Sequence, residues 1–179
     1  MSQVRDGDLE KLGILFERHH LRLFNFFLRM TGDRTASEDL VQEVFVRMLK
    51  YRKSFRERGE FSAWMFALAR NVSADYFGRR PRVTVADEVE LDEQPSGDPL
   101  PLEQLELAES LERLRGALLK LPEEKRELLL LTRSGGLTYE QIAAILGCSA
   151  GAVKVRVHRA LRHLRQVFRA PEMEAQHGA

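Results

Sequence analysis

The chain has 179 residues, 44% of them hydrophobic, which suits one large soluble domain or two small ones. Its 28 Lys/Arg and 27 Asp/Glu leave a net charge of +1, and its single cysteine excludes an intrachain disulfide. No secretory signal is visible, and no run approaches the ~20 apolar residues of a membrane span. We therefore expect a cytoplasmic protein without direct membrane insertion.

The near-neutral total conceals three charged blocks. Residues 45–82 hold ten Lys/Arg and three Asp/Glu, and residues 120–170 hold ten Lys/Arg and four Asp/Glu. Residues 83–109, between them, hold nine acids and no base. Two basic blocks on one chain indicate two contacts with a polyanion, although two solvated helix faces are the alternative.

The N-terminal part of the chain predicts three helices. Apolar residues recur at helical spacing from Leu9 to Gly32, from Ala36 to Tyr51 and from Phe61 to Arg79. The basic loop RKSFRERGE joins the second helix to the third. No strand pattern competes anywhere in the chain, so we predict an all-α fold.

The third predicted helix combines aromatic side chains with cations, which is typical of surfaces that bind unstacked bases, because every base has a π-face. Its polar residues include Arg70, Asn71, Arg79 and Arg80. However, Phe61, Trp64, Met65 and Leu68 follow the spacing of a core stripe. The residues therefore leave single-strand binding and simple core packing both open.

A break in the helical pattern separates two parts of the chain. The segment PRVTVADEVELDEQPSGDPLP is acidic, contains four of the six prolines and has no sustained periodicity. It is typical of a flexible, self-repelling linker. We therefore predict two small helical domains at 8–80 and 103–169, a flexible acidic linker at 81–102 and a disordered tail at 170–179.

The C-terminal part predicts four more helices. The first ends near Leu121, and Pro122 opens the second, which Gly135 and Gly136 end. The third begins with a capping box of Thr138 and Gln141.

Gly147 ends this third helix, and Ser149 can cap the fourth, which runs from Ala150 to about Arg169. A helix, a short glycine turn and a second helix form a helix-turn-helix.

Helical periodicity predicts which way the last helix faces. Its apolar face contains Val153, Val157, Ala160, Leu161, Leu164, Val167 and Phe168. The opposite face contains Val155, His158, Arg159, Arg162 and Arg169, flanked by Lys154 and Arg156. A helix-turn-helix lays such a face in the DNA major groove, where Arg159 can bind a guanine edge and Val155 a thymine methyl group. A solvated basic helix in a helical hairpin is the alternative.

No metal or cofactor site is expected. His19 and His20 are adjacent, but no cluster of Cys or carboxylates gives a metal-ligand spacing. Cys148 lies in the predicted turn, where it is more simply a small packing residue than a redox group.

Three segments in this order, DLVQEVFVRMLK, FSAWMFALARNVSADYFGRRPR and LTYEQIAAILGCSAGAVKVRVHRALRHLR, resemble the extracytoplasmic-function (ECF) sigma factors of bacterial RNA polymerase. The resemblance covers nearly the whole chain apart from the linker and the tail. A helix-turn-helix alone recurs in many regulators, but the three motifs in order around a linker are specific.

This resemblance implies that 8–80 is sigma region 2, which binds core polymerase and the −10 promoter element, and that 103–169 is region 4, which binds the −35 element. The implied −35 residues are Ser149, Lys154, Val155, Arg156, His158, Arg159 and Arg162. The implied −10 residues are Lys53, Phe55, Arg56, Arg58, Phe61, Arg70, Asn71, Arg79 and Arg80. Asp39, Gln42 and Glu43 match the positions that bind the polymerase β′ clamp helices.

The implied partners are core RNA polymerase, at its β′ clamp helices and β flap, promoter DNA, and an anti-sigma factor. The implied protein is not an enzyme and uses no cofactor. A stand-alone helix-turn-helix regulator is the alternative, and it would need a dimer and a palindromic operator. A nuclease using Asp87, Glu88 and Asp92 would lack a scaffold for these acids, because they lie in the predicted linker.

Overall fold

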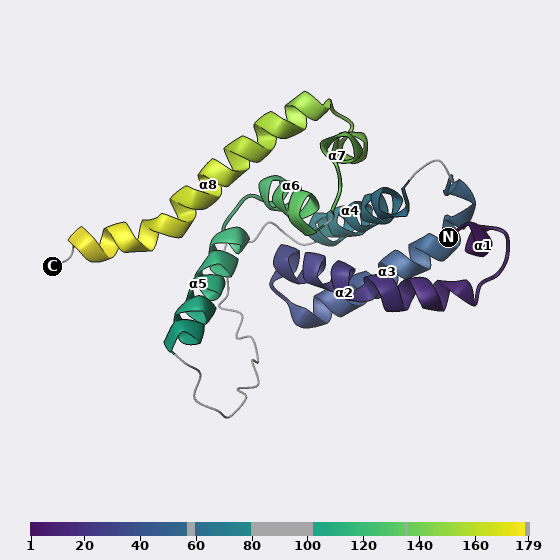
Figure 1. Ribbon diagram of the computed structural model, residues 1–179, viewed down its shortest axis with the longest axis horizontal. Helices are drawn as coiled ribbons and strands as arrows, with labels where there is room; N and C mark the ends of the chain where they lie inside the picture. Colours follow the sequence, from purple (N-terminus) through teal and green to yellow (C-terminus); the bar gives the residue numbers. More distant parts are fainter. Residues whose placement is uncertain (57–59, 80–101, 135, 178–179) are drawn as a thin grey trace.

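The computed structural model describes residues 1–56, 60–79, 102–134 and 136–177 (Figure 1). Within these residues the chain forms eight α-helices and one 3-10 helix and no strand, which confirms the predicted all-α fold. The predicted linker lies outside the described residues except for its last residue, Leu102, which begins a helix.

The N-terminal module consists of α1 (Ser2–Arg5), α2 (Lys11–Thr31), α3 (Arg34–Lys50), the 3-10 helix η1 (Arg52–Ser54) and α4 (Phe61–Arg79). α2 and α3 form a helical hairpin, in which the Asp33 side chain accepts a hydrogen bond of 2.9 Å from the Ala36 amide. Phe26 and Phe66, both fully buried, meet edge to face and join this hairpin to α4.

The C-terminal module consists of α5 (Leu102–Leu119), α6 (Glu123–Ser134), α7 (Tyr139–Leu146) and α8 (Ala150–His177). α6 packs against both α7 and α8, and Val153, Val157 and Ala160 are buried on the inner face of α8. The apolar face that the sequence predicts for α8 is therefore the face that the fold buries.

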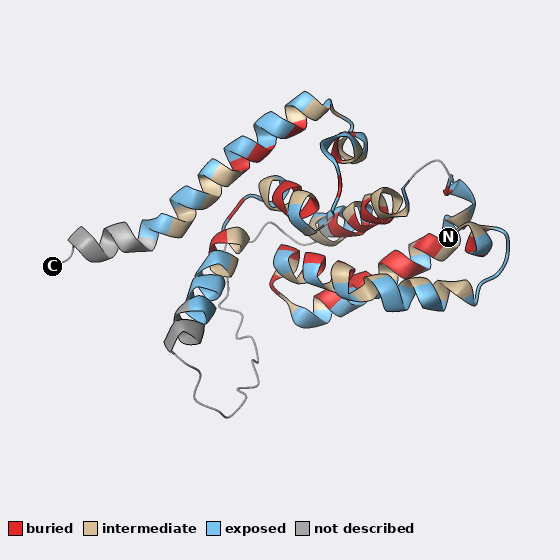
Figure 2. Ribbon diagram, viewed as in Figure 1, coloured by how far each residue is buried: buried red, intermediate tan, exposed pale blue. Residues whose placement is uncertain are grey.

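The two modules pack against each other. Met30 of α2 and Leu121 and Leu131 of the C-terminal module belong to one continuous cluster of buried side chains. Gly32, at the end of α2, is left-handed, and a Cβ atom there would lie 3.0 Å from Cδ1 of Leu119. Figure 2 shows buried residues on both α4 and α6, and α6 packs directly against α2. Both modules therefore share one core.

The helix ends mostly agree with the sequence, and two differences are clear. The short helix α1 was not expected, although its Val4 is fully buried. The final helix extends to His177, so the predicted end near Arg169 is wrong. Pro171 lacks an amide hydrogen, but good helix formers such as Glu172 and Met173 follow it and continue the helix.

Candidate nucleic-acid interface

The helix-turn-helix is built by local capping interactions. The Gln141 amide donates to the Thr138 hydroxyl over 3.3 Å, and the Gln141 side chain accepts from the Thr138 amide over 2.8 Å. Gly147 ends α7 with φ of 64°, in the left-handed region where glycine is unstrained. Each of these features agrees with the sequence, because a cap depends on residues three or four positions apart.

Ser149 is a structural residue of the turn. Its hydroxyl accepts a hydrogen bond of 3.1 Å from the Ala152 amide at the start of α8. This bond satisfies one of the free amide groups of the first helical turn. Although Ser149 is exposed, its oxygen already serves as a hydrogen-bond acceptor for the first turn of α8.

The outer face of α8 is exposed from Lys154 to Arg169 (Figure 2). Between Lys154 and Arg162 its exposed side chains are Lys154, Val155, Arg156, His158, Arg159 and Arg162. Val155 is 50% exposed in the middle of these cations, where an isolated helix would gain nothing from an apolar residue. We call this set the α8 surface; it comprises six of the seven residues predicted for the −35 element, and their role in binding it stays a prediction.

The loop before α4 presents a mixed surface. Lys53 and Arg56 are exposed, but Phe55 between them is only 7% exposed. The Phe55 ring lies 5.4 Å from Trp64 and 6.3 Å from Phe61, measured between ring centroids. Phe55 therefore anchors the loop on α4, and its ring would have to leave this aromatic cluster to stack on a base.

The exposed part of α4 is smaller than that of α8. Asn71 is exposed, while Arg70 forms an ion pair with Glu127 of α6. Arg58 and Arg80 lie outside the described residues. Arg79 is the last residue of α4, and its side chain is likewise outside the description.

Carboxyl and amide groups line the exposed side of α3. Asp39 and Gln42 are exposed and have the spacing of neighbours on a helix face. Glu43 is half-buried, and its carboxylate accepts a hydrogen bond of 2.7 Å from Arg47 Nε. Arg47 also reaches Asp75 of α4 over 2.7 Å, so it links Glu43 to the next helix.

Sequence reasoning missed Arg47. Its pairing with Glu43 was available from their spacing of four residues on one helix, whereas the contact with Asp75 depends on how α3 packs against α4.

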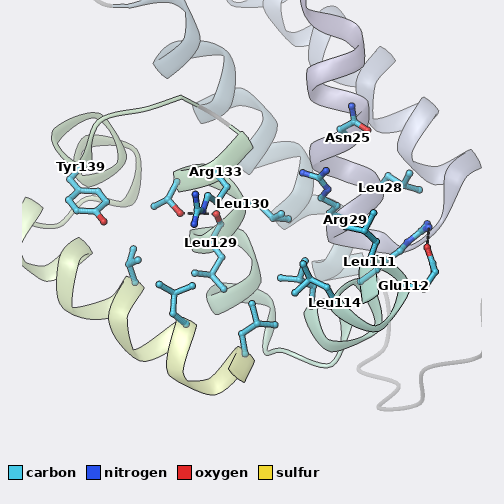
Figure 3. Close-up of a pocket in the computed structure, with 16 residues that line it drawn as sticks. Asn25, Leu28, Arg29, Leu111, Glu112, Leu114, Leu129, Leu130, Arg133 and Tyr139 are labelled. Atoms are coloured by element: carbon cyan, nitrogen blue, oxygen red, sulfur yellow. Dashed lines mark hydrogen bonds and ion pairs between the residues drawn. The ribbon is translucent and has the colours of Figure 1, made fainter. Parts of the chain in front are cut away.

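A cavity of about 770 Å³ lies between α2, α5, α6 and α8 (Figure 3). Half of its lining residues are leucines, among them Leu28, Leu111 and Leu114. Arg29, Arg115 and Arg133 add positive charge, and Glu112 is the one carboxylate among the lining residues that the structure describes. Within the described part of the chain, no group of three or more His, Cys, Asp or Glu is placed to bind a metal ion.

Two family models match the chain. The model "Sigma-70 region 2" matches residues 15–83, and the model "Sigma-70, region 4" matches residues 111–164. These ranges correspond to the N-terminal and C-terminal modules.

Relatives match over most of their own length. The ECF RNA polymerase sigma factor EcfG of Rhodopseudomonas palustris is 39% identical over 139 residues, which are 75% of this chain and 72% of the relative. The ECF RNA polymerase sigma-E factor of Escherichia coli is 32% identical over 168 residues, which are 89% and 87% of the two chains.

Solved structures have the same fold. CnrH, in complex with the cytosolic domain of CnrY, aligns with a TM-score of 0.69 at 27% identity and covers 94% of both chains. The sigma factor RpoE of Bartonella quintana, solved with the anti-sigma factor NepR, aligns with a TM-score of 0.70 at 24% identity over 90% of this chain and 98% of that one. The matched modules, their order and these relatives show that the chain belongs to the ECF sigma factors of RNA polymerase.

Proposed function

We propose that this protein binds core RNA polymerase, directs it to promoters that carry −35 and −10 elements, and helps to melt the upstream edge of the transcription bubble. The observation that carries this proposal is the α8 surface, a basic face left open to solvent on the second helix of a helix-turn-helix. The chain supplies binding and no catalysis, because RNA synthesis belongs to the polymerase.

The α8 surface is proposed to bind the −35 element. Arg159 is suited to a guanine edge and Val155 to a thymine methyl group. Lys154, Arg156 and Arg162 are suited to phosphates, which position the helix without reading the sequence. Affinity from these cations should fall as salt rises, so this surface alone gives weak binding at cellular salt.

The loop before α4 is proposed to bind the −10 element. Lys53, Arg56 and Asn71 are exposed, and Phe61 is half-buried at the start of α4. Extruding a base from a duplex costs on the order of a few kcal/mol, and cations next to a partly open aromatic cluster can offset that cost.

The exposed side of α3 is proposed to bind the β′ clamp helices, with Asp39 and Gln42 in direct contact. Glu43, which Arg47 holds, would define one edge of this site. The C-terminal module is proposed to contact the β flap.

An anti-sigma factor is a further proposed partner. CnrH, which is 27% identical to this chain over nearly its whole length, was solved with the cytosolic domain of CnrY. A cytoplasmic location is proposed with this function, because promoters and polymerase are there. No helix in the described part of the chain is long and apolar enough to span a membrane.

The proposal is tested with purified components. Core polymerase, with and without this protein, would transcribe a fragmented genomic library, and transcript starts would be mapped. We expect a set of starts that share −35 and −10 sequences and need the protein. A mixture that initiated no better than core polymerase alone would contradict the proposal, as would a protein dimer that bound a palindrome unaided.

A further inference from the structure

The two modules meet through a charged pair at the edge of their shared core. Arg70 of α4 donates from Nε to Glu127 of α6 over 3.3 Å. The Glu127 side chain is only 13% exposed, and that of Arg70 is 38% exposed. Arg70 is one of the residues predicted to bind the −10 element. A carboxylate of the C-terminal module is therefore paired with a cation of this predicted −10 surface.

The charged form of the Glu127 carboxyl is stabilised by Arg70. Burial raises the pKa of the Glu127 carboxyl, and the Arg70 cation works against this rise. An ionised carboxylate that is largely removed from water is costly unless a cation balances it. If Arg70 were lost, the packed arrangement would therefore retain a buried charge without compensation, and separation of the modules would return Glu127 to water.

Two further sets of hydrogen bonds join the same two modules. The Arg126 guanidinium donates to the backbone carbonyls of Met30, Leu119 and Leu121, and so joins the end of α2 to the end of α5. The Gln141 side chain donates to Glu60, which precedes α4, while its oxygen completes the capping box of α7. These contacts hold α6 against the end of α2 and α7 against the start of α4, and so keep together the modules to which Arg70 and Glu127 belong.

We propose that the Arg70–Glu127 pair is an autoinhibitory contact, in which the free factor covers part of its own −10 surface with its C-terminal module. The inference rests on the proposed function for the role of Arg70 in DNA binding. The α8 surface stays exposed in this closed state, and the −10 surface becomes complete only when the modules separate. Glu127 and promoter DNA then compete for one guanidinium.

A charge swap tests the pair in the free, full-length protein. Spin labels on Leu21→Cys in α2 and Ala144→Cys in α7, both at exposed positions, report the distance between the modules in a Cys148→Ser background. Glu127→Lys places two cations together, and Arg70→Glu places two acids together. We expect each variant to shift the closed-to-open ratio by roughly tenfold, as for loss of a hydrogen bond between charged groups.

The double variant Arg70→Glu/Glu127→Lys restores opposite charges and is expected to recover the closed distance. Glu109→Lys, at an exposed position on α5 whose charge does not act on Glu127, is the matched control and should leave the distance unchanged. Circular dichroism checks that each variant remains helical, and the milder Arg70→Gln replaces any variant that unfolds.

Distances unchanged in both single variants would overturn the proposal, and so would a double variant as open as the single ones. Binding of single-stranded −10 DNA by Glu127→Lys gives the functional readout, and we expect it to rise severalfold above that of the wild type. The distance measurement needs neither polymerase nor DNA. It therefore tests the Arg70–Glu127 contact separately from the proposed sigma function.

Discussion

The α8 surface and helix α4 both carry cations, but they differ in how the fold uses them. The cations of α8 point to solvent, whereas Arg70 of α4 is paired with the other module. α8 has one buried face, so periodicity alone predicts its exposed residues. α4 packs on the α2–α3 hairpin and also against α7, so the face that periodicity assigns to solvent is partly covered.

The largest effect is expected where the two modules are joined. Arg126→Ala removes three hydrogen bonds to carbonyls and leaves these groups without a partner at the junction of α2, α5 and α6. We expect it to lower the free energy of unfolding by about 2–3 kcal/mol, measured by urea denaturation. Arg133→Ala, at an exposed position on the same helix, is the control, and an equal loss in both variants would show that the position of Arg126 is unimportant.

A large effect on DNA binding is expected at the open surface. Arg159→Ala should weaken binding of the holoenzyme to a −35 element by about tenfold or more, because a bidentate contact with a base is worth on the order of 1–3 kcal/mol. Binding would be measured on promoters with the native and with altered −35 sequences. Gln166→Ala, exposed further along α8, should have little effect. If the wild-type holoenzyme bound native and altered −35 promoters equally well, the assignment of α8 to the −35 element would be wrong.

The acidic side of α3 offers an intermediate effect. Asp39→Ala with Glu43→Ala should reduce affinity for core polymerase roughly tenfold, as expected when interface charges lose their partners. Glu43→Ala alone also frees Arg47 from its hydrogen bond. The single variants Asp39→Ala and Arg47→Ala therefore separate direct contact from positioning. Unchanged affinity in the double variant, measured by fluorescence anisotropy, would place the clamp contact elsewhere.

The parts of the molecule that the sequence predicted are those that depend on neighbours in the chain. The capping box of Thr138, the left-handed Gly147 and the burial pattern of α8 all follow from spacings of a few residues. The same local rules predicted α4 from Phe61 to Arg79.

The contact between the modules could not be predicted in this way. Arg126 and Met30 are far apart in the sequence, and nothing in the period of α6 shows that its arginine meets the end of α2. The burial of Phe55 against Trp64 could not be predicted for the same reason, and its part in −10 binding stays a prediction. At the end of α8 a local rule gave the wrong boundary. Pro171 was expected to follow the end of the helix, but the helix continues through it to His177.

A smaller effect on stability is expected at the cap of α7. Thr138→Ala removes the acceptor of the Gln141 amide and should cost about 1 kcal/mol, visible as a lower melting temperature. Thr138→Ser retains the hydroxyl and is the control. Because Gln141 also contacts Glu60, a loss in Thr138→Ala that greatly exceeded this value would indicate that the cap supports the packing of the modules as well.

The smallest effect is a pH dependence that should act on the contact between the modules and not on the α8 surface. Burial raises the pKa of Glu127 in the packed state; Glu123 and Glu124 on its own helix raise it further, and Arg70 of α4 lowers it. A raised pKa means that the packed state binds a proton more tightly than the open state, in which Glu127 meets water. Packing should therefore strengthen as the pH falls through the raised pKa, and weaken as the pH rises above it. The spin-label distance measured between pH 7 and pH 5 checks this sign.

Glu127→Gln, which cannot titrate, is the reference, and the difference between it and the wild type isolates the contribution of this carboxyl. The dependence should be larger in Arg70→Met, because the carboxyl then lacks the cation that opposes its protonation. A closed fraction that fell on acidification in the wild type but not in Glu127→Gln would mean that the ion pair outweighs the cost of burial. The attraction between Arg70 and the ionised Glu127 carboxylate would then exceed the free-energy cost of burying that carboxylate.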